Sequence, residues 1–100
     1  MRVFNTQTLL AYGKDHAGSE QPFRELAKTL RDANWTSFED VRKAYPPLRS
    51  VKGERVIFNV NGNEYRVVAA MDYTRKGVFI KFVGTHAEYD KIGPETVNQY

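Results

Sequence analysis

The side chains best suited to acid–base chemistry lie near the end of the chain, in residues 84–92, which read GTHAEYDKI. An imidazole ordinarily titrates near about pH 6.5, closer to neutrality than other side chains, so His86 is the leading candidate for proton transfer. Tyr89 and Lys91 are second candidates, although a phenol ordinarily loses its proton only near about pH 10. On a helix, His86 and Asp90 lie four residues apart and can touch.

The same stretch also has a purely structural interpretation. Thr85 followed three residues later by Glu88 matches a capping box, in which each side chain bonds a backbone amide of the other residue. This pattern predicts a short C-terminal helix and accounts for Thr85 and Glu88. It does not account for His86 or Tyr89, which the cap would hold in the first turn.

Two cations interrupt runs of alternating apolar residues. Because successive side chains of a strand point to opposite faces, Arg66 is expected to face away from Val67, and Lys81 away from Ile80. By the same alternation, Phe82 is expected to share the face of Ile80. We expect Arg66 and Lys81 on the sheet face that helices leave open.

Lys52 and Arg55 come just before the first of these strands and are expected at the rim of the same face. Cations there keep an open sheet face soluble and discourage edge pairing. As a group, with aromatic residues nearby, they also suit single-stranded RNA, because phosphates contact cations and bases stack on rings. The aromatic residues in question are Tyr65, Tyr73 and Phe79.

Three helices are predicted before the strands. Residues 6–16 suit a short helix. Residues 1–5 are either a first strand or the segment that leads into this helix. Ser19 to Pro22 opens the second helix, whose apolar residues recur at helical spacing: Phe23, Leu26, Ala27 and Leu30. Ser37 is expected to cap a third helix over residues 38–44, with Asp40 at the reciprocal position. Trp35 is expected to be a core anchor between helices.

From Val51 onward the apolar period changes from helical to alternating. Two alternating runs flank Asn61–Gly62, a strong hairpin signal, and a third run covers residues 78–83. Helices followed by an antiparallel meander predict an α+β fold with the helices on one face of a small sheet. One hundred residues make one domain, residues 1–100.

Composition excludes several classes of protein. There is no cysteine and only one other histidine, His16, so we expect no metal site and no disulfide framework. No serine-hydrolase, phosphate-loop or dinucleotide motif occurs. No long apolar run or signal peptide is present, so we expect a soluble cytoplasmic protein. The net charge of +3 permits a polyanionic partner.

Two segments carry a family resemblance. VIFNVNGNEYRVVA (residues 56–69) and VFIKFVGTHAEYDKI (residues 78–92) resemble the HigB-type branch of the RelE-like bacterial toxins. Residues 35–41, WTSFEDV, resemble the same family, and the likeness covers roughly residues 20–92. The segment PPLRSVKG (residues 46–53) departs from the family pattern, so the resemblance assigns it no role.

The resemblance implies a RelE-like fold and the toxin of a type II toxin–antitoxin system. Such a toxin is a metal-independent endoribonuclease, with no cofactor, that cuts mRNA on the translating ribosome. Its partner is a HigA-like antitoxin with a helix-turn-helix domain. Two alternatives remain open: a noncatalytic RNA- or ribosome-binding module of the same fold, and a basic face that receives an acidic protein.

The resemblance also suggests residue roles. The catalytic group is His86 as the acid–base residue, Arg66 and Lys81 as phosphate clamps, and Tyr89 as a second acid–base candidate. A second group is expected to bind RNA, with Lys52 and Arg55 on its backbone: Lys52, Arg55, Tyr73 and Lys91.

Overall fold

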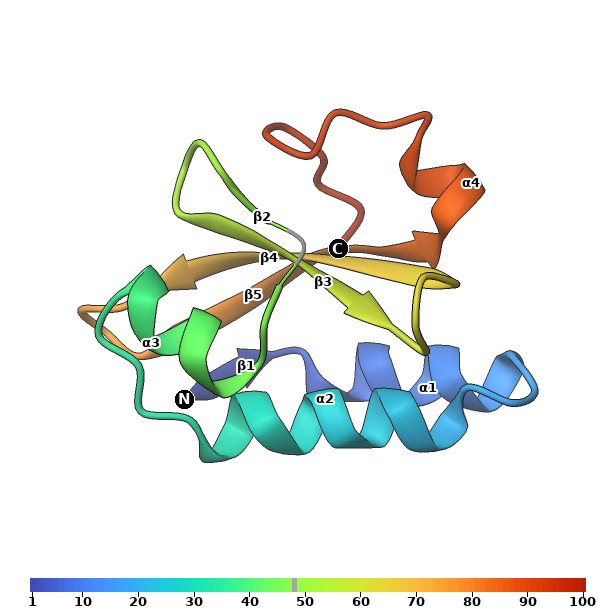
Figure 1. Ribbon diagram of the computed structural model, residues 1–100, viewed down its shortest axis with the longest axis horizontal. Coiled ribbons are helices and arrows are strands. Elements are labelled where there is room, and N and C mark those ends of the chain that lie inside the picture. The colour runs from blue at the N-terminus through green and yellow to red at the C-terminus, as the bar shows by residue number, and fades with distance from the viewer. Residues whose placement is uncertain (48) are drawn as a thin grey trace.

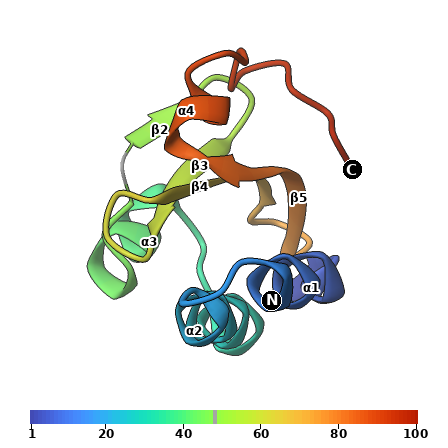
Figure 2. The same ribbon diagram turned by 90° about the vertical axis from the view of Figure 1, so that its right-hand side faces the viewer.

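The computed structural model describes residues 1–47 and 49–100. Its elements in chain order are β1 (Arg2–Phe4), α1 (Thr6–Asp15), α2 (Glu20–Asp32), α3 (Phe38–Ala44), β2 (Arg49–Val51), β3 (Arg55–Val60), β4 (Tyr65–Asp72), β5 (Gly77–Thr85) and α4 (His86–Tyr89). The strands form one sheet in the order β1-β5-β4-β3-β2. Helices α1 and α2 cover one face, and α4 lies on the other (Figures 1 and 2). This arrangement confirms the α+β prediction and the short C-terminal helix.

The sheet is mixed and not wholly antiparallel. Strands β3 to β5 pair antiparallel, as the meander predicted, and β2 adds to β3 antiparallel, whereas β1 pairs with β5 in parallel. Residues 1–5 therefore begin with a strand, and Asn5 caps α1 by accepting a hydrogen bond from the Gln7 amide at 2.9 Å. Strand β2 was not predicted, because three residues are too few to show an alternating pattern.

The main core lies between the sheet and the helices. Helix α2 buries the predicted stripe Phe23, Leu26, Ala27 and Leu30, and Trp35 is only 6% exposed. The predicted cap of α3 is wrong in detail. Ser37 makes no side-chain bond as the N-cap, and the Asp40 carboxylate instead accepts hydrogen bonds from the amide and hydroxyl of Thr36. A carboxylate can reach either amide, so the spacing alone did not decide between them.

A β-bulge in β5 changes which side chains face the helices. Val68 pairs with Phe82, but Ala69 pairs with Ile80, so Lys81 is the extra residue. The alternation therefore shifts by one. Ile80 packs in the main core while Phe82 packs on the opposite face, which contradicts the expectation that they share a face.

We call the sheet face that carries α4 the outer face. Its apolar centre is a cluster of four buried residues, Ile57, Val68, Phe82 and Tyr89. Polar residues flank this outer cluster, because Asn59 and Arg66 lie opposite one another on β3 and β4, one alternation beyond Ile57 and Val68. Of the three aromatic residues expected near the cations, Tyr65 is instead buried in the main core.

Candidate active site

The capping box predicted for residues 85–88 is present and fixes α4. The Thr85 hydroxyl accepts from the Glu88 amide at 3.1 Å, and the Glu88 carboxylate accepts from the Thr85 amide at 2.8 Å. The His86 amide donates to the backbone oxygen of Glu64 at 2.9 Å, tying α4 to the β3–β4 turn. Although α4 has only four residues, its first turn is therefore held over the outer face.

Arg66 is the buried cation of this site. It is 6% exposed, and its guanidinium carbon lies 5.0 Å from the centre of the Tyr89 ring, within the range of a cation–π contact. Its Nη2 donates to Asn63 Oδ1 at 2.6 Å. No carboxylate forms an ion pair with it among the residues that the structure describes. A desolvated positive charge without a counter-ion favours an incoming anion.

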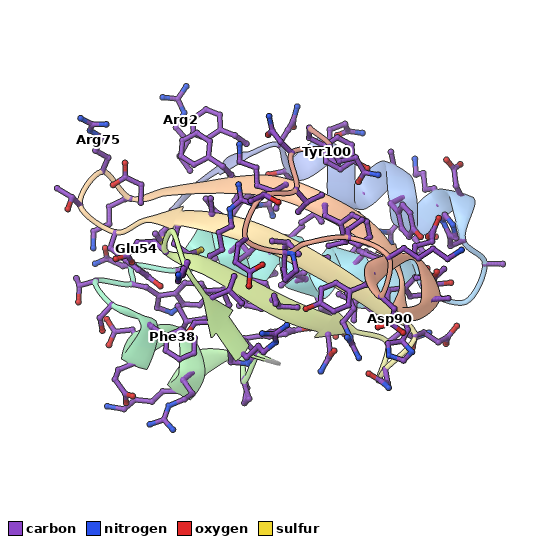
Figure 3. All side chains as sticks on the ribbon, turned by 90° about the horizontal axis from the view of Figure 1, so that it is seen from above. Arg2, Phe38, Glu54, Arg75, Asp90 and Tyr100 are labelled. Carbon is purple, nitrogen blue, oxygen red and sulfur yellow. The ribbon has the colours of Figure 1, made fainter. Side chains whose placement is uncertain are left out.

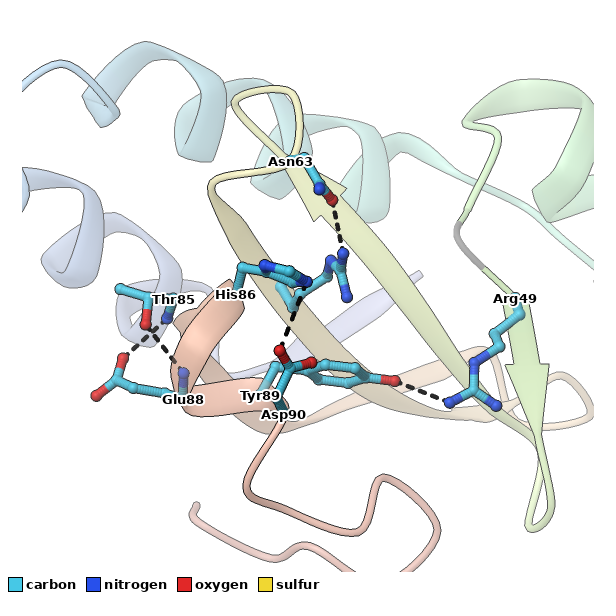
Figure 4. A network of polar contacts seen from close by, with 8 residues as sticks. Arg49, Asn63, Thr85, His86, Glu88, Tyr89 and Asp90 are labelled. Atoms are coloured by element: carbon cyan, nitrogen blue, oxygen red, sulfur yellow. Dashed lines mark hydrogen bonds and ion pairs between the residues drawn. The ribbon is translucent and has the colours of Figure 1, made fainter.

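Arg49, which lies on β2, contacts the hydroxyl of Tyr89. Its Nη2 donates to the Tyr89 hydroxyl at 3.1 Å, across 40 residues of sequence. Arg49 lies opposite Ile57 in the β2–β3 register, which places it on the outer face. Tyr89 thus has the guanidinium of Arg66 over its ring. Figure 4 shows Arg49 at the Tyr89 hydroxyl.

His86 is open to a substrate. Its Nε2 lies 3.7 Å from Asp90 Oδ2, and both side chains are exposed, at 48% and 60%. The predicted contact across one helical turn is therefore present as an ion pair when the imidazole is protonated. Figure 4 shows His86 and Asp90 beside Tyr89, with Asn63 on the neighbouring turn.

Comparison with known proteins identifies the family to which the chain belongs. Residues 19–92 match the family model HigB_toxin, described as the RelE-like toxic component of a toxin–antitoxin system. The chain belongs to this HigB-type toxin family. An "mRNA interferase HigB" of Escherichia coli O6:H1 (strain CFT073) is 29% identical over 93 residues, covering 77% of this chain and 90% of the relative. An "mRNA interferase toxin HigB" of E. coli K12 is 34% identical over 67 residues, covering 65% of this chain and 64% of the relative.

The part that matches the HigB-type family contains every residue of the site just described. Two of these residues, Arg49 and Asn63, were not singled out from the sequence. Arg49 stands in the segment that departs from the family pattern, and only the pairing of β2 with β3 shows its direction. Asn63 follows Asn61–Gly62 in the hairpin turn, where asparagine is common for structural reasons, so its type did not indicate a functional role.

Lys81 and Arg55 lie on the outer side of this HigB-type fold but hold the C-terminal segment, residues 93–100. Arg55 Nη1 donates to the backbone oxygens of Pro94 and Val97 at 3.0 and 2.7 Å. Lys81 Nζ donates to Asn98 Oδ1 at 3.2 Å. Neither makes a hydrogen bond to Arg66, His86 or Tyr89 within residues 1–47 and 49–100.

Three of the four predicted RNA contacts lie together, away from His86, because Arg55 lines the same hollow as Lys52 and Tyr73. Lys52 and Tyr73 line a hollow of about 260 Å³ between α3 and the β2–β3 turn. Phe38 and Glu54, which also line it, lie far from Asp90 (Figure 3). Burial raises the pKa of Tyr73 to about 12, and the ring packs against the main core. Lys91 is exposed just after α4, nearer to the site.

Two further observations concern other classes of site. Across the described residues, no three His, Cys, Asp or Glu side chains gather as a metal site requires. Nor is any described helix long and apolar enough to cross a membrane.

Proposed function

We propose that the chain is an mRNA interferase, a metal-independent endoribonuclease that cuts mRNA on the translating ribosome. The observation that carries the proposal joins Arg66 to α4. The buried Arg66 guanidinium has no carboxylate partner among the residues that the structure describes, and it lies against the ring of Tyr89. Tyr89 belongs to α4, which also presents the exposed His86. Membership of the toxin family supports it, as do curated relatives named mRNA interferases.

The reaction needs only groups of the RNA and of this chain. A base removes the proton of the 2′-OH, the resulting oxygen attacks the adjacent phosphorus, and the bond to the 5′-oxygen breaks. The 5′-oxygen takes a proton from an acid, leaving a 2′,3′-cyclic phosphate and a 5′-OH. Arg66, with Arg49 or Lys81, stabilises the charge that develops on the phosphate oxygens. His86 transfers a proton, with Tyr89 and Lys91 as second candidates.

The partners follow from the same proposal. A HigA-like antitoxin with a helix-turn-helix domain neutralises the toxin in the cytoplasm, where the translating ribosome presents the mRNA. Lys52, Arg55 and Lys91 contact mRNA or ribosomal RNA backbone. The family description, which names a toxin–antitoxin system, supports an antitoxin partner.

The test is to map new 5′ ends of mRNA after incubation with translating ribosomes. The wild-type chain should create new ends, and His86→Ala and Arg66→Ala should abolish them while remaining folded. His16→Ala is the matched control, because the other histidine packs on Tyr12 in the helical layer, with ring centres 3.8 Å apart. Ribosome binding without new ends would overturn the nuclease proposal in favour of a noncatalytic binding module.

A further inference from the structure

Two polar atoms on directly opposite residues of the outer face are buried and unpaired. Asn59 on β3 and Arg66 on β4 are register partners. Asn59 Oδ1 and Arg66 Nε both lack a hydrogen-bond partner within the described part of the chain. Buried polar groups in folded proteins are nearly always paired, so two orphans on neighbouring residues require an explanation.

The two atoms are chemically complementary. Nε–H of a guanidinium only donates, and an amide oxygen only accepts. Side chains directly opposite on an antiparallel pair have Cβ atoms about 4.5–5.5 Å apart, within reach of one another. On its other side, Arg66 pairs with Gly84, which has no side chain. Asn59 therefore supplies the polar side chain directly opposite Arg66.

The present contacts of Arg66 explain why the pair is open. Nη2 is held by Asn63 at 2.6 Å, and the guanidinium plane is engaged with Tyr89. Asn59 itself is anchored, because the Tyr45 hydroxyl donates to its backbone oxygen at 3.0 Å. An anion that draws Nη2 away from Asn63 would let the guanidinium turn, while the Asn59 backbone stays in place.

We propose that Asn59 is a positioning residue for Arg66. When a phosphate of the RNA binds the Nη groups of Arg66, Nε–H pairs with Asn59 Oδ1 and the guanidinium is locked with its fork toward the phosphate. Asn59 does not touch the reacting atoms. The role rests on the proposed RNA-cleaving function and adds to it a residue that acts through Arg66.

The kinetic test compares two variants of nearly equal size. Asn59→Leu removes the acceptor, and we expect kcat for mRNA cleavage on ribosomes to fall by about ten- to a hundredfold, with little change in KM. Asn59→Gln keeps an amide oxygen as acceptor without adding a charge beside Arg66, and it should recover most of the loss. Asn34→Ala, at an exposed position between α2 and α3, is the control and should cleave like the wild type.

A second measurement needs no turnover. The probe is a short RNA with 2′-deoxy sugar at the cleavage position, and the readout is the exchange rate of the Arg66 Nε proton by NMR. Binding should slow this exchange in the wild type and in Asn59→Gln, but not in Asn59→Leu. The amide spectrum of each variant establishes that it is folded.

The outcomes separate the two proposals. If the wild type cleaves mRNA and Asn59→Leu has the same kcat, Asn59 has no positioning role. Equal slowing of Nε exchange in Asn59→Leu would overturn the pairing even if kcat fell. A wild type that cuts no mRNA would overturn the proposed function, and the NMR comparison would still decide whether Asn59 holds Arg66.

Discussion

The guanidinium carbon of Arg66 lies 5.0 Å from the centre of the Tyr89 ring, although the residues come from a strand and from a separate four-residue helix. This contact joins the cationic part of the outer face to its apolar cluster. Tyr89 is 7% exposed and packs with Ile57, Val68 and Phe82 while its hydroxyl accepts from Arg49. The position of the buried cation is therefore coupled to the packing of α4.

Two substitutions of Tyr89 should distinguish how much its ring packing and its hydroxyl hydrogen bond each contribute to stability. Tyr89→Phe keeps the ring over Arg66 and loses only the hydroxyl bond, so we expect it to lower the free energy of unfolding by about 1 kcal/mol. Tyr89→Ala removes a buried ring and should cost about 3–5 kcal/mol. Urea denaturation measures both. Equal losses for the two variants would show that the ring is not a packing residue.

Gly84 should not tolerate a methyl group. A Cβ at this position would lie 2.5 Å from the Phe82 ring and 3.1 Å from the Glu88 carboxylate that caps α4. We expect Gly84→Ala to cost about 1–3 kcal/mol in denaturant titration, because the ring and the cap must both move. Gly93→Ala is the control, since its nearest neighbour is the Thr96 hydroxyl at 3.3 Å. A larger loss at Gly93 would contradict this account of crowding.

Arg55 should hold the C-terminal segment in the free protein. Removing its two bonds to Pro94 and Val97 by Arg55→Met should speed hydrogen exchange at the Gln99 amide, which donates to the Lys81 backbone oxygen at 2.9 Å. Lys52→Met, a change at an exposed residue, is the control and should leave the exchange of the Gln99 amide unchanged.

The same pair of variants tests the predicted RNA contacts. If Arg55 and Lys52 both neutralise RNA phosphates, each variant should reduce the slope of log K for RNA binding against log salt concentration by about one. Unchanged exchange at Gln99 in Arg55→Met, together with a reduced salt dependence, would show that Arg55 serves RNA and not the C-terminal segment.

The contact between Thr36 and Asp40 at the start of α3 should make stability pH-dependent at the acid end. The amide and the hydroxyl of Thr36 hold the pKa of the Asp40 carboxyl below its ordinary value of 3.8. A lowered folded-state pKa stabilises the fold above the unfolded-state value, and this stabilisation is lost as the pH falls through the folded-state pKa. The loss of free energy of unfolding caused by Asp40→Ala should therefore be at its full value near neutrality and become smaller below about pH 4. A loss of stability that stays constant down to low pH would contradict this role of the Asp40 carboxylate.

Alternation and helical spacing were sufficient for most of the architecture. They predicted α2, α3, the hairpin of β3 and β4, and the outward direction of Arg66, because each pattern depends on residues close together in the chain. The capping box of α4 was predictable for the same reason, since Thr85 and Glu88 are three residues apart.

The remaining features depend on pairing between distant segments. The bulge at Lys81 arises from how β5 aligns with β4, and it sends Phe82 to the outer face, where local alternation predicted the opposite. The parallel pairing of β1 with β5 and the contact of Arg49 with Tyr89 likewise join segments far apart in sequence. The sequence by itself determined the helices, the strands β3 to β5 and the candidates His86, Arg66 and Tyr89. Only the tertiary structure decided which cations meet at Tyr89, because strand register is set by packing across the whole sheet and not by any one segment.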